Sequence, residues 1–375
     1  MKMHIGGQWI DKDDKLEVRN PFDNQIIDTV PKSTPQDVSD AIATAVKGAQ
    51  VMRRMPAFER YQLLDKAARL MYERQEELGQ TITQEEGKVI AEGRGEASRS
   101  AETITLSAEE AKRLTGETLD LTAASNGAGK FGFTLRVPCG VVAAITPFNF
   151  PLNLVCHKVG PALAAGNAVI VKPASDTPLS AIKLVEILLE AGFPAEAVSV
   201  MTGAGASIGD AIASDPRIRK ISFTGSRDVG EHICRTAGLK RVTMELGSNS
   251  PVVVMDDADL DKVADGVAVA GFANAGQVCI SAQRILVEDK VYGDFTEALK
   301  TRVEAIATGN PLEEGTAMGP MIRESDAERV ESWVQDAVAG GARLVTGGSR
   351  SGTMHQPTIL ADVDPSMRVS CDEIF

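Results

Sequence analysis

The sequence is poor in aromatic side chains, in basic charge and in long apolar runs, and each shortage excludes a class of function. Only 4% of the 375 residues are aromatic, and acidic residues outnumber basic ones to give a net charge of −13. An acidic chain without a Lys/Arg cluster is not expected to bind nucleic acid. No apolar run approaches the ~20 residues of a membrane-spanning helix. The N-terminal MKMHIGGQWIDKDD lacks the apolar stretch of a secretory signal. We therefore expect a cytoplasmic protein without nucleic-acid or membrane partners.

The five cysteines are too scattered for a disulfide framework or a zinc site. Cys139, Cys156, Cys234, Cys279 and Cys371 include no CxxC pair, so we expect reduced thiols and no metal site. Cys279 lies within NAGQVCISAQR, among small and polar residues. It is either a buried structural thiol, which is the commoner place for a free cysteine, or a nucleophile presented on a loop.

The chain length predicts two domains. Residues 34–116 have helical patterns, and Thr34-Pro35-Gln36-Asp37 predicts an N-cap followed by the first helical turn. Residues 117–137 alternate on both sides of SNGAG, which predicts a β-hairpin. Because an isolated hairpin is only marginally stable, we expect it to pack on another domain or subunit.

Short β-rich apolar runs alternate with helical patterns after residue 140. The runs are VVAAIT, AVIVK, VSVM, KISFT and PVVVM. This rhythm predicts a parallel sheet covered by helices on both faces. Such sheets bind ligands beyond the carboxyl ends of their strands, which is where candidate functional residues should lie. A further helix over about 260–275 and the strand RILVE predict a second α/β unit.

Two strand ends carry candidates for catalysis. Asn149 lies between Pro147 and Pro151, so its amide is held in place, as the donor of an oxyanion hole must be; the alternative is an Asx-turn with its own backbone. Glu245 directly follows the apolar RVTM. Partial burial there would raise its pKa toward the range of a general base, and the alternative is a structural salt bridge.

Two further strand ends carry candidates for binding. Lys172 ends AVIVK and either reaches a sugar hydroxyl or phosphate or is a solvated surface lysine. Phe223-Thr224-Gly225-Ser226 runs into a helix, whose free amides would cradle a pyrophosphate. It is not a GxGxxG fingerprint, and a plain serine N-cap is the alternative.

Taken in order, these segments resemble the NAD(P)-dependent aldehyde dehydrogenase superfamily over the whole chain. The matching stretches are Thr146–Pro151, Val171–Ala174, Phe223–Ser226, Glu245–Gly247, Gly276–Cys279 and Glu373–Phe375. The resemblance implies an α/β fold in which residues 1–116 and 140–246 form a Rossmann-like cofactor-binding domain. Residues 117–139 would form a β-hairpin oligomerisation arm, and residues 247–375 an α/β catalytic domain.

The resemblance also implies the catalytic roles. Cys279 would attack the aldehyde to give a thiohemiacetal, with the oxyanion held by the Asn149 amide and the Cys279 backbone N–H. Hydride transfer to NAD or NADP would leave a thioester on Cys279, and Glu245 would activate the water that hydrolyses it. The residues expected to contact the cofactor are Thr146, Pro147, Phe148, Lys172, Ser175, Phe223, Thr224, Gly225, Ser226, Leu246, Glu373 and Phe375.

Departures from the family pattern bear on specificity. Ser175 stands where many NAD-preferring relatives have a glutamate, so NADP is as well accommodated as NAD. Val278 replaces the arginine that often precedes the nucleophile in enzymes for phosphorylated aldehydes. Arg99 stands where some relatives keep an anion-binding arginine, although it would serve equally as an exposed helix charge. With few aromatic residues, these features favour a short polar aldehyde, lactaldehyde- or semialdehyde-like.

Two alternatives and one departure remain open. A CoA-acylating semialdehyde dehydrogenase is one alternative, although such enzymes generally lack the base that Glu245 supplies. A non-catalytic, truncated relative of the fold is the other. Relatives usually continue beyond the Glu373-Ile374-Phe375 motif, so we expect the catalytic domain to be C-terminally incomplete. A homodimer or homotetramer is expected if a C-terminal segment is present.

Overall fold

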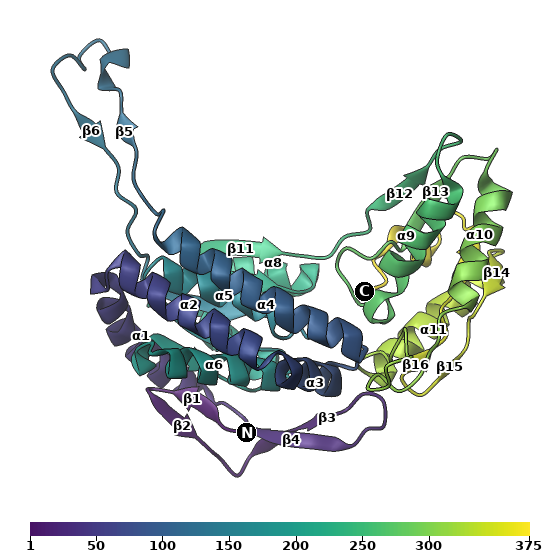
Figure 1. The fold of residues 1–375 in the computed structure, drawn as a ribbon, viewed down its shortest axis with the longest axis horizontal. Coiled ribbons are helices and arrows are strands. Elements are labelled where there is room, and N and C mark those ends of the chain that lie inside the picture. The colour runs from purple at the N-terminus through teal and green to yellow at the C-terminus, as the bar shows by residue number, and fades with distance from the viewer.

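The computed structural model describes residues 1–375, in which a large α/β unit and a smaller one lie side by side and a hairpin arm projects from the larger (Figure 1). The large unit is built on a seven-stranded sheet of order β11-β10-β7-β8-β9-β1-β2. Its strands are β1 (Met3–Ile5), β2 (Gln8–Ile10), β7 (Val141–Ile145), β8 (Ala168–Lys172), β9 (Val198–Val200), β10 (Ile218–Thr224) and β11 (Arg241–Glu245).

The five strands from β11 to β9 run parallel, and β1 and β2 add an antiparallel edge. Every residue of β7 and β8 is buried, as the continuous apolar runs predict for strands covered on both faces. The predicted parallel sheet is confirmed, with one correction. The run PVVVM does not join this sheet, because β12 (Pro251–Val254) pairs with β13 (Arg284–Val287) in the smaller unit.

Helices cover both faces of the sheet, and α2, α4 and α5 pack together above it (Figure 1). Thr34 caps α1 as predicted: its side chain accepts from the Asp37 N–H, and the Asp37 carboxylate accepts from the Thr34 N–H. The helices of the large unit are α1 (Pro35–Arg54), α2 (Ala57–Glu73), α3 (Gln75–Glu86), α4 (Ile90–Ala111), α5 (Asn153–Ala164), α6 (Leu179–Ala191), α7 (Gly205–Ser214) and α8 (Arg227–Ala237), with the short η2 (Ala195–Ala197).

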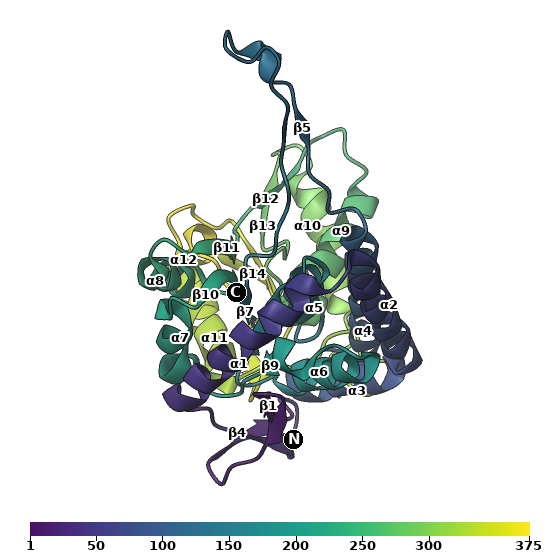
Figure 2. The ribbon, with the colours of Figure 1, turned by 90° about the vertical axis from the view of Figure 1, so that its left-hand side faces the viewer.

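Two small antiparallel pairs accompany the large unit. The first is β3 (Lys15–Arg19) with β4 (Ile26–Pro31). The second is the predicted hairpin, β5 (Thr118–Leu119) with β6 (Gly132–Phe133), whose tip contains η1 (Leu121–Ala123). Figures 1 and 2, seen at right angles, both show this arm extending away from the body of the molecule. Phe131 and Leu135 on this arm are 74% and 71% exposed.

The smaller unit surrounds the β12–β13 pair. Its remaining elements are α9 (Leu260–Phe272), η3 (Ala273–Gly276), α10 (Tyr292–Glu304), α11 (Glu324–Ala339), β14 (Arg343–Thr346), β15 (Arg350–Ser351), β16 (Met354–His355), β17 (Ile359–Ala361) and α12 (Arg368–Cys371). The helix expected over 260–275 stops at Phe272, since Asn274 and Ala275 adopt left-handed backbone angles with φ of 50° and 54°.

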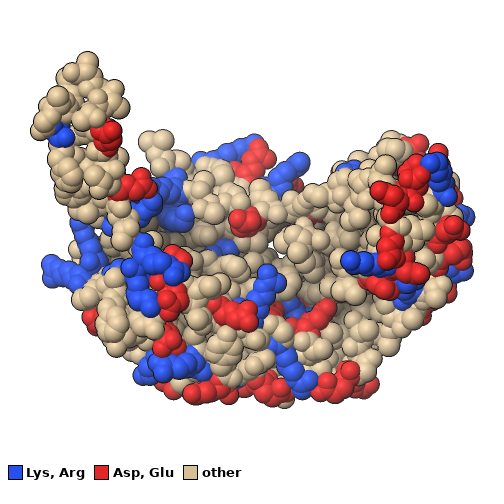
Figure 3. Space-filling model, turned by 45° about the horizontal axis from the view of Figure 1, so that its top comes forward, with Lys and Arg blue, Asp and Glu red and all other residues tan.

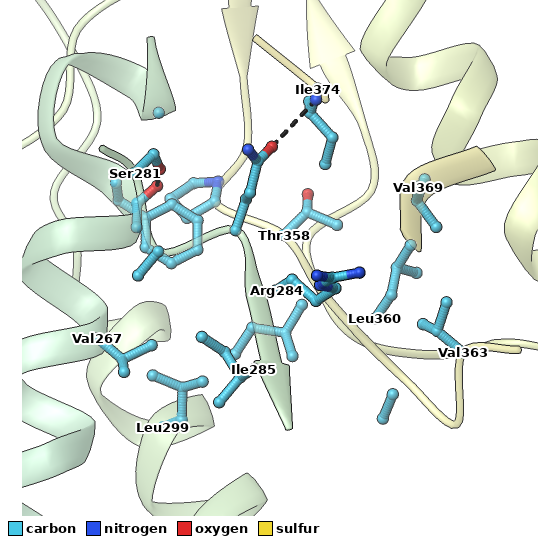
Figure 4. Close-up of a pocket in the computed structure, with 18 of the residues that line it drawn as sticks. Val267, Ser281, Arg284, Ile285, Leu299, Thr358, Leu360, Val363, Val369 and Ile374 are labelled. Atoms are coloured by element: carbon cyan, nitrogen blue, oxygen red, sulfur yellow. Dashed lines mark hydrogen bonds between the residues drawn. The ribbon is translucent and has the colours of Figure 1, made fainter. Parts of the chain in front are cut away.

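The two units have separate apolar cores of very different size. The large unit contains a cluster of 58 buried apolar residues, while the cluster of the smaller unit has six. The smaller unit also holds an apolar cavity of about 710 Å³. Val267 from α9, Ile285 from β13, Leu299 from α10 and the C-terminal Ile374 line it (Figure 4).

Charged side chains of both signs are spread over the surface, with Lys and Arg grouped near the base of the arm (Figure 3). No helix is both long enough and apolar enough to cross a membrane.

Candidate active site

The carboxyl ends of the parallel strands bring most of the predicted site residues to one edge of the large sheet. Lys172 ends β8, Thr224 ends β10 and Glu245 ends β11, with Thr224 and Glu245 paired in register. Asn149 follows β7, which lies between β8 and β10. The edge faces the smaller unit, so residues of both units meet there (Figure 1).

Asn149 is almost fully buried, with 2% of its surface exposed. Its Nδ2 donates to the backbone carbonyl of Gln277 at 2.8 Å, and its Oδ1 has no hydrogen-bond partner. The amide therefore does not bond its own backbone, as an Asx-turn would. Because an amide nitrogen carries two hydrogens, one remains for another acceptor beside the loop that holds Cys279.

Cys279 lies on the loop that follows η3 and is half-buried. Gln277 fixes this loop from both sides: its Nε2 donates to the Asn274 carbonyl at 3.1 Å, and its Oε1 accepts from the Ile322 N–H at 3.0 Å. Cys156, by contrast, is buried within α5, and burial raises the pKa of its thiol. Cys279 therefore lies on a loop rather than in the core, and Cys156 is a buried core thiol.

Glu245 ends the edge strand β11 and is exposed, with no cation within 4.0 Å of its carboxylate. The expectation of partial burial is wrong, because β11 has a neighbour on one side only and its outer surface is open. The salt-bridge alternative is also wrong. The carboxylate is free to meet water or a ligand at this edge.

Two basic residues near Glu245, His157 and Lys158, were not singled out from the sequence. Lys158 on α5 donates from Nζ to the Thr224 hydroxyl at 2.6 Å, and burial lowers the pKa of Lys158 to about 8, against an opposing effect of Glu245. Burial also lowers the pKa of His157, helped by the nearby charges of Lys158 and Arg99. The available signal was a His-Lys pair inside an otherwise apolar helix.

Arg99 is exposed on α4, which packs against α5. Its charge and that of Glu245 both act on His157, so these three side chains share one region of the site. The exposure of Arg99 that the sequence left as an alternative is observed.

Lys172 and Ser175 follow β8. Lys172 is 6% exposed, so the solvated-lysine alternative is wrong, and burial lowers its pKa to about 8. Its Nζ donates to the Pro173 carbonyl at 2.9 Å, and the Ser175 hydroxyl donates to the Gly203 carbonyl at 3.2 Å. Both side chains retain further hydrogen-bonding capacity for a ligand.

The Phe223–Ser226 turn leads into α8 as predicted. Ser226 is the N-cap residue, but its side chain makes no capping hydrogen bond. The first amides of α8 are therefore not met by that hydroxyl and suit a phosphate. A Cβ on Gly225 would come within 2.6 Å of the ring of Phe223, which is 4% exposed, so the turn favours glycine at this position.

The C-terminal residues reach the same edge. Glu373 Oε1 accepts from the Ser248 N–H at 2.7 Å. The Phe375 ring meets the Phe148 ring edge-on, with centroids 5.6 Å apart, and the Ile374 N–H donates to Gln283 Oε1 at 3.0 Å (Figure 4). The buried Thr146 hydroxyl has no partner. An unpartnered hydroxyl, a helix N-terminus and a buried lysine along one sheet edge form a donor set that fits a dinucleotide.

The large cavity of the smaller unit is not this site. It is lined by Gln277 and Phe375, but by none of Asn149, Glu245 and Cys279. Twenty-two of its 36 lining residues are hydrophobic, which suits packing rather than the binding of a charged cofactor.

Comparison with known proteins agrees with this geometry. Residues 9–375 match the model of the aldehyde dehydrogenase family. The chain is 46% identical to 3-sulfolactaldehyde dehydrogenase of Priestia aryabhattai, covering all of this chain and 78% of that protein. It is 40% identical to the NADP(+) succinate-semialdehyde dehydrogenase of Escherichia coli, over 99% of this chain and 78% of that one.

Solved structures give the same answer. The fold matches that of NADP-dependent glyceraldehyde-3-phosphate dehydrogenase from Bacillus halodurans, complexed with NADP, with a TM-score of 0.97 at 37% identity. The match covers all of this chain and 79% of that one. The chain belongs to the aldehyde dehydrogenase family and is an NAD(P)-dependent oxidoreductase.

Proposed function

We propose that this enzyme oxidises a short aldehyde bearing an anionic group to the acid, through a thioester on Cys279. The observation that carries the catalytic part is the hydrogen bond from Asn149 to the Gln277 carbonyl, which ties an amide donor to the loop of the thiol. Cys279 Sγ gives up its proton to solvent and bonds to the carbonyl carbon, and the oxygen that becomes negative accepts from the second N–H of Asn149. A preorganised donor of this kind contributes ~2.7–4 kcal/mol to lowering the barrier.

When bound, the nicotinamide would supply the acceptor for hydride, and loss of hydride from the aldehyde carbon would leave the acyl group on Cys279 Sγ. Glu245 is exposed at the adjacent strand end and takes a proton from the water that attacks the thioester. Water adds to the acyl carbon, the carbon–sulfur bond breaks, and the acid leaves as the Cys279 thiol is restored. Glu245 opposes the lowering of the Lys158 pKa that burial causes, so the charge of Lys158 lies within electrostatic reach of this carboxylate.

Lys172, Ser175 and the α8 N-terminus are proposed to hold the adenosine half of the cofactor, with the other predicted cofactor residues along the same edge. Glu373 would accept a hydrogen bond from the nicotinamide ribose. Its present hydrogen bond from the Ser248 N–H would then be lost. Residues 1–116 and 140–246 then serve as the cofactor-binding domain, residues 117–139 as the oligomerisation arm, and residues 247–375 as the catalytic domain. A homodimer or homotetramer would cover the exposed arm.

The anionic group of the substrate is proposed to meet Arg99 and His157. Arg99 supplies a permanent charge, and His157, whose pKa is lowered, supplies a neutral hydrogen-bond donor at neutral pH. The relatives named for 3-sulfolactaldehyde and succinate semialdehyde act on aldehydes with a sulfonate or a carboxylate, which supports the same class here.

The test is turnover with matched aldehydes. Succinate semialdehyde and 3-sulfolactaldehyde should be preferred over the uncharged propionaldehyde, and Arg99→Ala should reduce that preference while leaving propionaldehyde oxidation within about twofold. Equal rates for charged and uncharged aldehydes would refute the anionic class. Product analysis with and without CoA separates hydrolysis from acyl transfer to CoA, since only the former yields the free acid.

A further inference from the structure

Lys88 is a fully buried cation that the catalytic scheme does not use. It lies between α3 and α4, and 1% of its side chain is exposed. Burying an ammonium costs several kcal/mol unless every hydrogen is matched. Lys88 Nζ donates to Glu96 Oε2 at 2.7 Å and to the Asn149 carbonyl at 2.6 Å, and it lies 4.0 Å from the centroid of the Phe150 ring. The ammonium thus has two oxygen acceptors and an aromatic face as partners.

Glu96 extends this contact along the loop that carries Asn149. While Oε2 pairs with Lys88, Oε1 accepts from the N–H groups of Leu152 and Asn153 at 2.9 and 3.0 Å, where α5 begins. The ion pair therefore forms hydrogen bonds with both ends of the segment from Asn149 to Asn153. That segment contains Pro151 and the buried amide of Asn149, so it has little freedom once its ends are fixed.

The same cluster reaches the loop of Cys279. Glu86 accepts from the Lys88 backbone N–H at 2.9 Å and, through Oε1, from Asn274 Nδ2 at 2.7 Å. Glu92 accepts from the Asn274 N–H at 3.2 Å. Asn274 and Ala275 have positive φ, a conformation that costs about 1–3 kcal/mol per non-glycine residue and persists only where neighbours enforce it. The carboxylates supply that enforcement.

We propose that Lys88, with Glu96, is a positioning residue that sets the distance between the Asn149 amide and the loop of Cys279. Lys88 is assigned no contact with substrate or cofactor and acts through the backbone carbonyl of Asn149, the residue whose side chain is the oxyanion donor. The inference rests on the proposed function, in which Asn149 holds the oxyanion. It adds a buried ion pair that holds the segment of Asn149, beside Glu86 and Glu92, which hold Asn274 ahead of Cys279.

The variants are Lys88→Met, which keeps the length of the side chain without its charge, and Glu96→Gln. The matched control is Glu85→Gln, because Glu85 is also a buried carboxylate that accepts from the first amides of a helix, Leu179 and Ser180 of α6, without contacting Lys88. Lys88→Met and Glu96→Gln should lower kcat by about tenfold or more, as weakening one oxyanion donor does. In both variants the KM for the cofactor should stay within about twofold of that of the unmodified enzyme. The kcat of the Glu85→Gln control should stay within the same range.

A double-mutant cycle separates positioning from general support of the fold. In an Asn149→Ala background the second change should cost less than about twofold, because the donor that Lys88 positions is already gone. Additive losses, or equal losses in Glu96→Gln and Glu85→Gln, would overturn the proposal. If Lys88→Met does not fold, the Glu96→Gln cycle alone decides.

A crystal structure of Lys88→Met or Glu96→Gln gives a readout independent of turnover. The distance from Asn149 Nδ2 to the Gln277 carbonyl should lengthen from 2.8 Å beyond hydrogen-bonding range; an unchanged distance in both variants contradicts the inference. Absence of Cys279-dependent turnover in the unmodified enzyme would instead refute the proposed function. The crystal structures of the variants would still test whether Lys88 positions Asn149.

Discussion

The side chain of Asn149 donates to the backbone carbonyl of Gln277 across 128 positions of sequence, with nitrogen and oxygen 2.8 Å apart. This contact joins the end of a buried strand in the large unit to the loop of Cys279 in the smaller one. It ties an amide donor to the loop that carries a thiol, although the two residues are far apart along the chain.

Asn149→Ala should reduce kcat by about 10²–10³, the loss typical of one oxyanion-hole donor. The KM for NADP should change little, since the amide acts on the reacting carbonyl oxygen. Steady-state kinetics with a saturating aldehyde measures both. A loss of cofactor affinity equal to the loss of kcat would show that Asn149 supports the fold rather than the oxyanion.

Glu245→Gln should separate the two half-reactions. Acylation of Cys279 yields one equivalent of reduced nicotinamide per site, and hydrolysis then slows by about 10²–10⁴, the usual contribution of a general base. Stopped-flow absorbance should record a burst followed by slow turnover. Glu288→Gln, an acidic residue away from this edge, provides the control. A burst that disappears in Glu245→Gln would mean that this carboxylate is needed before hydrolysis.

Ser175→Glu should turn the enzyme toward NAD. A carboxylate at this position would repel a 2′-phosphate, so kcat/KM with NADP should fall by about tenfold or more, corresponding to 1.4 kcal/mol or more. The value with NAD should fall less or rise. Separate titrations with the two cofactors measure the ratio, and a ratio that does not move would place the 2′-hydroxyl away from Ser175.

Stability should fall as pH rises from about 5 to 8. Burial raises the pKa of Glu85 to about 7 and that of Glu86 to about 8 from an ordinary 4.5. Between those values the folded chain binds protons that the unfolded chain has released, so folding is favoured at the lower pH and that advantage is lost as pH rises through the folded pKa values. Urea-unfolding midpoints across this range should decline less steeply in Glu86→Gln; a parallel decline would contradict the assignment.

The sequence predicted those parts of the site that local pattern determines. VVAAI and AVIVK are apolar throughout, so strands buried on both faces, and ligand groups at their ends, followed from periodicity. The roles of Asn149, Glu245 and Cys279 came from the family resemblance, since each residue type has commoner structural uses.

Long-range contacts escaped prediction for a physical reason. Nothing near Lys158 in sequence indicates that its ammonium meets Thr224, or that Lys88 meets the Asn149 carbonyl. The exposure of Glu245 depends on β11 being an edge strand, and PVVVM was misplaced because an apolar run does not specify its partner. The exposure of Glu245 and the strand partner of PVVVM both depend on the order of strands in the sheets, which the local sequence does not specify.

The most direct test of the account is a rapid-quench experiment on Glu245→Gln with succinate semialdehyde and NADP, followed by peptide mass spectrometry. Site mapping is required because Cys234 and Cys371 are exposed, whereas Cys279 is half-buried. The account predicts an acyl group on the peptide that contains Cys279, formed at the rate of the burst and absent in Cys279→Ala. Reduced cofactor without an acylated Cys279, or acylation of another cysteine at that rate, would contradict it.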